Sequence, residues 1–125
     1  IDSVIEIKER GEKARSFIEE IKKGNDKFYT STLTLDEVMW VVQKEKDHET
    51  AYESVKTIID IPNLDFIPIT IEVIMKALEI YKKEKLDPLD SIHLAAMKEK
   101  NVSIIISSDP DFDKIKNIKR IDFTK

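Results

Sequence analysis

The stretch that decides the fold is VSIIISSD, residues 102–109, in which a mostly β-branched apolar run ends at two serines and an acid. Runs of this kind are typical of strands in a parallel sheet that helices cover on both faces. Helical patterns longer than the strands, such as 70–85 and 89–100, separate these runs. The alternation predicts an α/β sandwich built on a mostly parallel sheet.

The other elements follow from the same signals. Thr34 and Glu37 have the spacing of a capping box, which predicts a helix that begins at Thr34. Ile1 and Asp2 are interpreted as the end of a buried strand whose earlier part is absent from the chain. Helices and strands are predicted in the order helix 12–23, strand 28–33, helix from 34, helix 49–61, strand 64–69, helix 70–85, helix 89–100, strand 102–106 and strand 118–123.

Length and composition narrow the kinds of site that the chain could carry. Its 125 residues predict a single domain spanning 1–125. The absence of cysteine and the presence of only two histidines leave oxygen ligands for any metal, which favours Mg²⁺ or Mn²⁺. A net charge of −4 argues against a protein that coats nucleic acid by charge alone. No apolar stretch approaches the roughly 20 residues needed to cross a membrane, so a cytoplasmic location is the expectation.

Four acids are predicted to lie at one edge of the sheet. Ligands of open parallel sheets bind beyond the carboxyl ends of the strands, where the next helices begin. Asp2 ends a predicted strand and Asp109 follows one, and Glu37 and Asp90 lie in the first turns of predicted helices. Clustered carboxylates repel one another unless cations neutralise them. The pattern therefore predicts a magnesium or manganese site suited to phosphoryl chemistry, since such ions can activate a water molecule and stabilise a leaving oxygen.

Four segments, in this order and spacing, resemble the PIN-domain family over nearly the whole chain: IDS at 1–3, STLTLDEV at 31–38, LDSIHLAA at 89–96 and IISSDPDF at 105–112. The resemblance implies a three-layer α/β/α sandwich that cleaves RNA with Mg²⁺ or Mn²⁺. It implies metal ligation by Asp2, Glu37, Asp90 and Asp109, with Asp111 as a fifth acid and Ser107 as a supporting hydroxyl. The chain's size resembles that of VapC-type toxins, which implies a small antitoxin partner and a homodimer.

One departure keeps alternatives open. The family has a polar residue, often Asn, two positions after its first Asp, whereas Val4 stands two positions after Asp2. Either residues are missing between Ser3 and Val4, or the first ligand is disturbed and the fold serves as a catalytically inactive module that binds protein or RNA. A phosphatase of the haloacid dehalogenase type is a third alternative, and it would need a second Asp where Val4 stands.

Each candidate residue also has a purely structural interpretation. Glu37 could complete a helix cap, and Asp90 could be an acid favoured by the dipole at a helix start. Asp109 before a proline could form a turn. His93 is interpreted as a packed histidine with a satisfied hydrogen bond rather than a general base. Trp40 is expected in the core or at an interface rather than stacked on a base.

Overall fold

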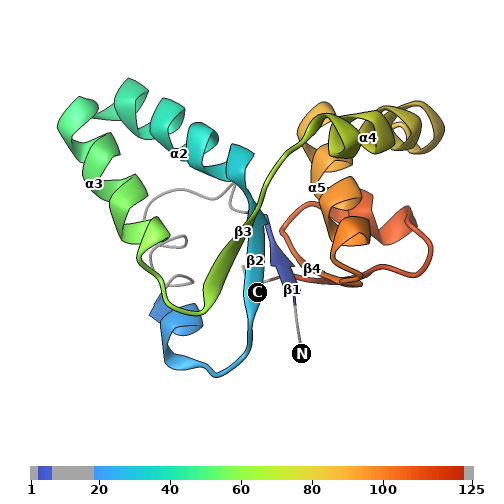
Figure 1. The fold of residues 1–125 in the computed structure, drawn as a ribbon, viewed down its shortest axis with the longest axis horizontal. Helices are drawn as coiled ribbons and strands as arrows, with labels where there is room; N and C mark the ends of the chain where they lie inside the picture. The colour runs from blue at the N-terminus through green and yellow to red at the C-terminus, as the bar shows by residue number, and fades with distance from the viewer. Residues whose placement is uncertain (1–2, 7–18, 123–125) are drawn as a thin grey trace.

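The computed structural model describes residues 3–6 and 19–122, and its centre is a parallel sheet (Figure 1). All the described strands pair in parallel, in the order β3-β2-β1-β4-β5. Their bounds are β1 Ser3–Ile5, β2 Phe28–Ser31, β3 Leu64–Ile67, β4 Ile104–Ile106 and β5 Lys119–Ile121. Because β1 lies in the middle, between β2 and β4, Glu6 at its carboxyl end is surrounded by other elements.

Helices cover both faces of this sheet. Figure 1 shows α2 and α3 on one side of the strands and α4 and α5 on the other. Their bounds are α2 Thr32–Glu45, α3 His48–Ile59, α4 Ile71–Glu84 and α5 Pro88–Glu99, and a short 3₁₀ helix, η1, spans Pro110–Lys114. The architecture is the three-layer α/β/α sandwich that the sequence predicted.

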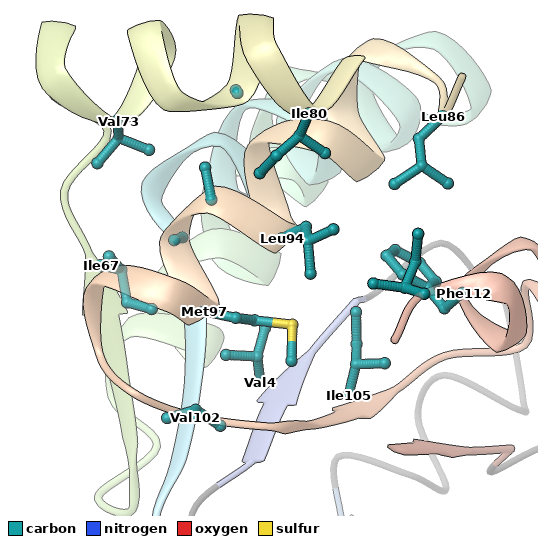
Figure 2. Packing of buried hydrophobic residues seen from close by; sticks show 14 residues of the cluster. Val4, Ile67, Val73, Ile80, Leu86, Leu94, Met97, Val102, Ile105 and Phe112 are labelled. Atoms are coloured by element: carbon teal, nitrogen blue, oxygen red, sulfur yellow. The ribbon is translucent and has the colours of Figure 1, made fainter. Parts of the chain in front are cut away.

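Two buried clusters hold the layers together. Side chains alternate between the faces of a strand, so Val4 packs into one cluster while its neighbour Ile5 packs into the other. The larger cluster joins β1 and β4 to α5 through Leu94 and Met97, which are fully buried. Figure 2 shows these side chains together with Phe112, which η1 inserts over the same face. The helix that carries Asp90 is therefore fixed firmly against the strands.

Most predicted elements are confirmed within a few residues, and two boundaries are wrong. The first strand does not end at Asp2, because β1 spans Ser3–Ile5. Residues 1–2 and 7–18 lie outside the described part of the chain, so the structure describes the predicted helix 12–23 only from residue 19, and residues 19–23 are helical. Among the described residues, no helix combines the length and apolar character that membrane crossing requires.

The second wrong boundary is the start of α2, which begins at Thr32 with Ser31 as its N-cap. The Thr34 hydroxyl bonds to the hydroxyl of Thr30 at 2.7 Å, and Thr30 donates to the carbonyl oxygen of Ile5 at 2.9 Å. The Thr34 hydroxyl is therefore bonded to Thr30 of β2, and Thr34 does not form the predicted capping box. These bonds hold the backbone at the end of β1, next to Glu6.

Candidate metal centre at the carboxyl edge of the sheet

The candidate site lies where β1 and β4 end side by side. Ile5 pairs with Ile106 in the parallel ladder, and the backbone N–H of Glu6 donates to the carbonyl oxygen of Ile106 at 3.0 Å. Glu6 is therefore the first residue beyond β1, and Ser107 is its counterpart beyond β4. The third contributor is α5, whose first turn carries Asp90.

Three acids converge at this edge. Glu6, Asp90 and Asp109 each offer a carboxylate oxygen, and these oxygens all lie within 4.8 Å of one another. Glu6 is 1% exposed and Asp90 is fully buried, whereas Asp109 is partly exposed. The cluster is therefore enclosed on two sides and reaches solvent at Asp109.

A chain of hydrogen bonds fixes the Glu6 and Asp109 segments relative to each other. The Ser107 hydroxyl donates to Glu6 Oε1 at 2.8 Å and accepts the backbone N–H of Asp109 at 3.0 Å. His93 Nδ1 lies 3.0 Å from Glu6 Oε2. Asp109 Oδ1 accepts the backbone N–H of Asp111 at 2.9 Å and caps η1. The acids are thus oriented by their neighbours, and Asp109 both caps a turn and belongs to the cluster.

Arg120 supports the same edge from β5. Its Nη1 donates to the carbonyl oxygen of Ser107 at 3.1 Å, while its Nε and Nη2 donate to the carboxylate of Asp113 at 2.8 and 3.0 Å. The hydrogen bond to Asp113 raises the pKa of the Arg120 guanidinium above its usual value. A permanently charged side chain therefore anchors the backbone turn that leads from Ser107 to Asp109.

The donor set fits a divalent cation. Three carboxylates this close repel one another, and burial of Glu6 and Asp90 withdraws the water that would weaken the repulsion. A cation held by oxygen atoms would remove that repulsion, and carboxylate oxygens are the ligands of Mg²⁺ and Mn²⁺. The residues present therefore suit either ion.

The structure brings together two of the acids predicted from the sequence, Asp90 and Asp109. Asp2 lies outside the described residues. Glu37 is partly exposed in the second turn of α2, Asp111 is exposed in η1, and neither belongs to the described group of converging acids. Because Ser31 is the N-cap, Glu37 does not have the capping role that was its structural alternative, and its role as a ligand stays a prediction.

Glu6 is the acid that sequence reasoning missed. An acid directly after the apolar pair Val4 and Ile5 was a usable signal, since Asp109 was found by the same rule after the strand of residues 102–106. The strand end had been assigned to Asp2 instead. Of the other side chains, His93 is buried with a hydrogen bond, as expected. Trp40 is 64% exposed, which excludes the core, and its place at an interface stays a prediction.

A parallel sandwich with an acidic cluster at the carboxyl edge of its sheet is an arrangement suited to metal-dependent phosphodiester chemistry. The PIN-domain family model matches residues 3–118, and the chain belongs to the PIN-domain family. A search of curated proteins gives no match.

Solved structures of VapC toxins share the fold. A VapBC2 complex from Rickettsia felis, bound to a promoter DNA fragment, contains a chain with 16% identity and a TM-score of 0.68, covering 97% of this chain and 98% of that one. VapC20 of Mycobacterium tuberculosis, a Sarcin-Ricin loop cleaving toxin, has 17% identity and a TM-score of 0.68, covering 90% and 93%. VapBC-1 from nontypeable Haemophilus influenzae has 13% identity and a TM-score of 0.70, covering both chains completely.

Proposed function

We propose that this PIN-domain protein is an endoribonuclease that depends on Mg²⁺ or Mn²⁺ and hydrolyses RNA phosphodiesters. Glu6, Asp90 and Asp109 hold the cation, and Asp2, Glu37 and Asp111 are the further acids that the family pattern proposes for the site. The observation that carries the proposal is the convergence of three carboxylates within 4.8 Å at the carboxyl edge of the sheet. Membership of the PIN-domain family supports the same reaction class.

Each acid of the cluster has a distinct part in this proposal. A bound divalent cation supplies Lewis-acid activation of water and neutralises phosphate charge. Glu6 and Asp90, both buried, hold it from the protein side and exclude bulk water. Asp109 is the partly exposed member, so the RNA phosphate approaches from the Asp109 side. The chain needs no covalent nucleophile, because water is the attacking group.

An antitoxin and a second copy of the chain are the proposed partners. Structures of the same fold include toxin-antitoxin complexes. In this chain, α4 exposes a row of apolar side chains at helical spacing: Ile71 at 65%, Met75 at 62%, Leu78 at 58% and Tyr81 at 48%. Burying such a row favours association. With RNA and an antitoxin as partners, the proposed location is the cytoplasm.

The test is cleavage of single-stranded and structured RNAs in EDTA, Mg²⁺ or Mn²⁺, with wild type compared with Asp90→Asn. Asp87→Asn is the matched control, because it makes the same change on the same helix at an exposed side chain that forms no capping bond. We expect cleavage by wild type and Asp87→Asn only with a cation, and none by Asp90→Asn. A folded wild type that neither binds a cation nor cleaves any RNA would overturn the proposal.

The second candidate is a module that binds RNA or protein without catalysis. It is favoured by the hydrogen bonds to both carboxylate oxygens of Glu6, which satisfy that side chain without a cation. The same experiment separates the two functions. RNA binding that is equal in EDTA and Mn²⁺ and unchanged in Asp90→Asn, with no cleavage, would favour the binding module.

A further inference from the structure

We propose that His93 is a positioning residue, which holds the Glu6 carboxylate in the orientation that binds the cation. The inference rests on the proposed function, because it concerns the same cation site. His93 does not itself belong to the group of converging acids among the described residues.

The contacts of Glu6 fix the plane of its carboxylate. His93 Nδ1 lies 3.0 Å from Oε2, and the Ser107 hydroxyl donates to Oε1 at 2.8 Å. A carboxylate held at only one oxygen can still turn about its last bond, whereas bonds to both oxygens stop that rotation. Each carboxylate oxygen can accept more than one bond, so these two bonds do not exhaust the acceptor capacity of the carboxylate. The two bonds therefore orient Glu6 in a way that is compatible with binding a cation.

The length of the Glu6 side chain makes this restraint important. Glutamate has one more rotatable bond than aspartate, so more conformational freedom is lost when its carboxylate is fixed at one point. Burial of Glu6 and His93, each 1% exposed, keeps water from competing for the bond between them. The bond therefore lowers the cost of holding a long acid in the geometry that a small cation requires.

The position of His93 on α5 links two of the proposed ligands. His93 follows Asp90 by three residues, so both side chains lie on the same side of the helix, nearly one turn apart. The backbone placement that brings Asp90 to the sheet edge also brings His93 to Glu6. The first turns of α5 therefore fix where Asp90 lies relative to Glu6, because His93 bonds to Glu6 from the same stretch of helix.

His93 is unsuited to a catalytic role of its own. Its ring is buried, and Nε2 has no hydrogen-bond partner among the described residues, so no path for a proton leads from the ring to solvent there. A general base must reach the proton that it removes directly or through one water molecule. The contact with Glu6 is therefore the function of the side chain.

The experiment measures Mn²⁺ affinity by electron paramagnetic resonance on the full chain, without RNA. Loss of an outer hydrogen bond to a metal ligand typically costs about 10- to 100-fold in affinity. We expect that loss for His93→Leu. The decisive pair is His93→Asn and His93→Gln, because the Asn amide nitrogen occupies the position of Nδ1 and the Gln nitrogen occupies that of Nε2. Asn should keep affinity within about threefold of wild type, and Gln should lose it as Leu does.

Circular dichroism and thermal unfolding in EDTA establish which variants are folded. If His93→Leu fails to fold, the difference in Mn²⁺ affinity between His93→Asn and His93→Gln still tests the role of His93. Wild type that binds Mn²⁺, with Gln and Leu variants that bind it equally tightly, would overturn the role of His93 and leave the proposed function standing. Wild type that binds no Mn²⁺ would overturn both.

Discussion

Substitution of Asp90 by Asn should stabilise the protein in the absence of metal, and the stability of the variant should no longer increase when metal is added. Two unit charges at 4.8 Å, the largest separation of the converging oxygens, repel by about 3.5 kcal/mol at an effective dielectric constant of about 20. Asp90 faces two such neighbours, but Asp109 is partly exposed, so solvent screens part of the repulsion. We therefore expect Asp90→Asn to raise the free energy of unfolding in EDTA by about 1–3 kcal/mol.

The assay is thermal unfolding of wild type, Asp90→Asn and Asp87→Asn in EDTA and in Mn²⁺. For a chain of this size each kcal/mol moves the melting temperature by about 3–6 °C, so the increase in EDTA should be readily measured. At a Mn²⁺ concentration of about 100 times its Kd, wild type should gain about 2.7 kcal/mol, and Asp90→Asn should gain nothing. The difference in stability between the two should therefore shrink or reverse when metal is added.

Two results would refute this reasoning. One is an Asp90→Asn variant that is less stable than wild type in EDTA, since the carboxylate would then stabilise the fold rather than strain it. The other is equal stabilisation of both proteins by Mn²⁺. Asp87→Asn should stay within about 0.5 kcal/mol of wild type in EDTA and keep the full response to metal, because its side chain is exposed.

Three further predictions concern other parts of the chain. Glu37→Gln should leave the stability in EDTA within about 0.5 kcal/mol of wild type but slow RNA cleavage, while the control Asp36→Asn should change neither the stability nor the cleavage rate. Equal cleavage rates of Glu37→Gln and wild type would remove Glu37 from the site. Phe112→Ala should lower the free energy of unfolding in urea by about 3–5 kcal/mol, because Phe112 is fully buried, and a loss below 1 kcal/mol would contradict the packing over α5. In light scattering, Leu78→Glu should convert the proposed dimer to a monomer without changing its stability, whereas the control Glu79→Ala should keep the dimer. A Leu78→Glu variant that is still dimeric would exclude the exposed apolar row of α4 as the dimer contact.

The fold was predictable because its elements are marked by local signals. The run of residues 102–106 is apolar at neighbouring positions, as a strand covered on both faces requires, and it became β4. Asp87 and Pro88 marked the start of α5 correctly. The helix start predicted at Thr34 was wrong. The spacing of a capping box is a local pattern, and it does not reveal the tertiary contact of Thr34 with Thr30. Where a polar side chain can bond either to its own helix or to a strand, the sequence does not say which occurs.

The candidate site was predictable in part for a related reason. Asp90 and Asp109 follow from the rule that acids at the carboxyl edge of a parallel sheet converge, and the structure brings them together. Glu6 was missed because β1 is only three residues long and its boundary was drawn at the acid that matched the family pattern. An error of this size is decisive, since successive residues of a strand point to opposite faces and a short shift selects a different side chain.

The register of β1 therefore decides which acid of the strand end joins the described cluster. Pairing of Ile5 with Ile106 places Glu6 beside Ser107, and the His93 and Ser107 side chains that bond to Glu6 come from outside β1. A slip of β1 by one residue that paired Glu6 with Ile106 would turn the Glu6 side chain onto a face of the sheet and exchange the faces on which Val4 and Ile5 lie, which the buried packing of Val4 and Ile5 opposes. The same apolar contacts that stabilise the sheet thus select which acid stands among the carboxylates, and the bonds from His93 and Ser107 then orient it.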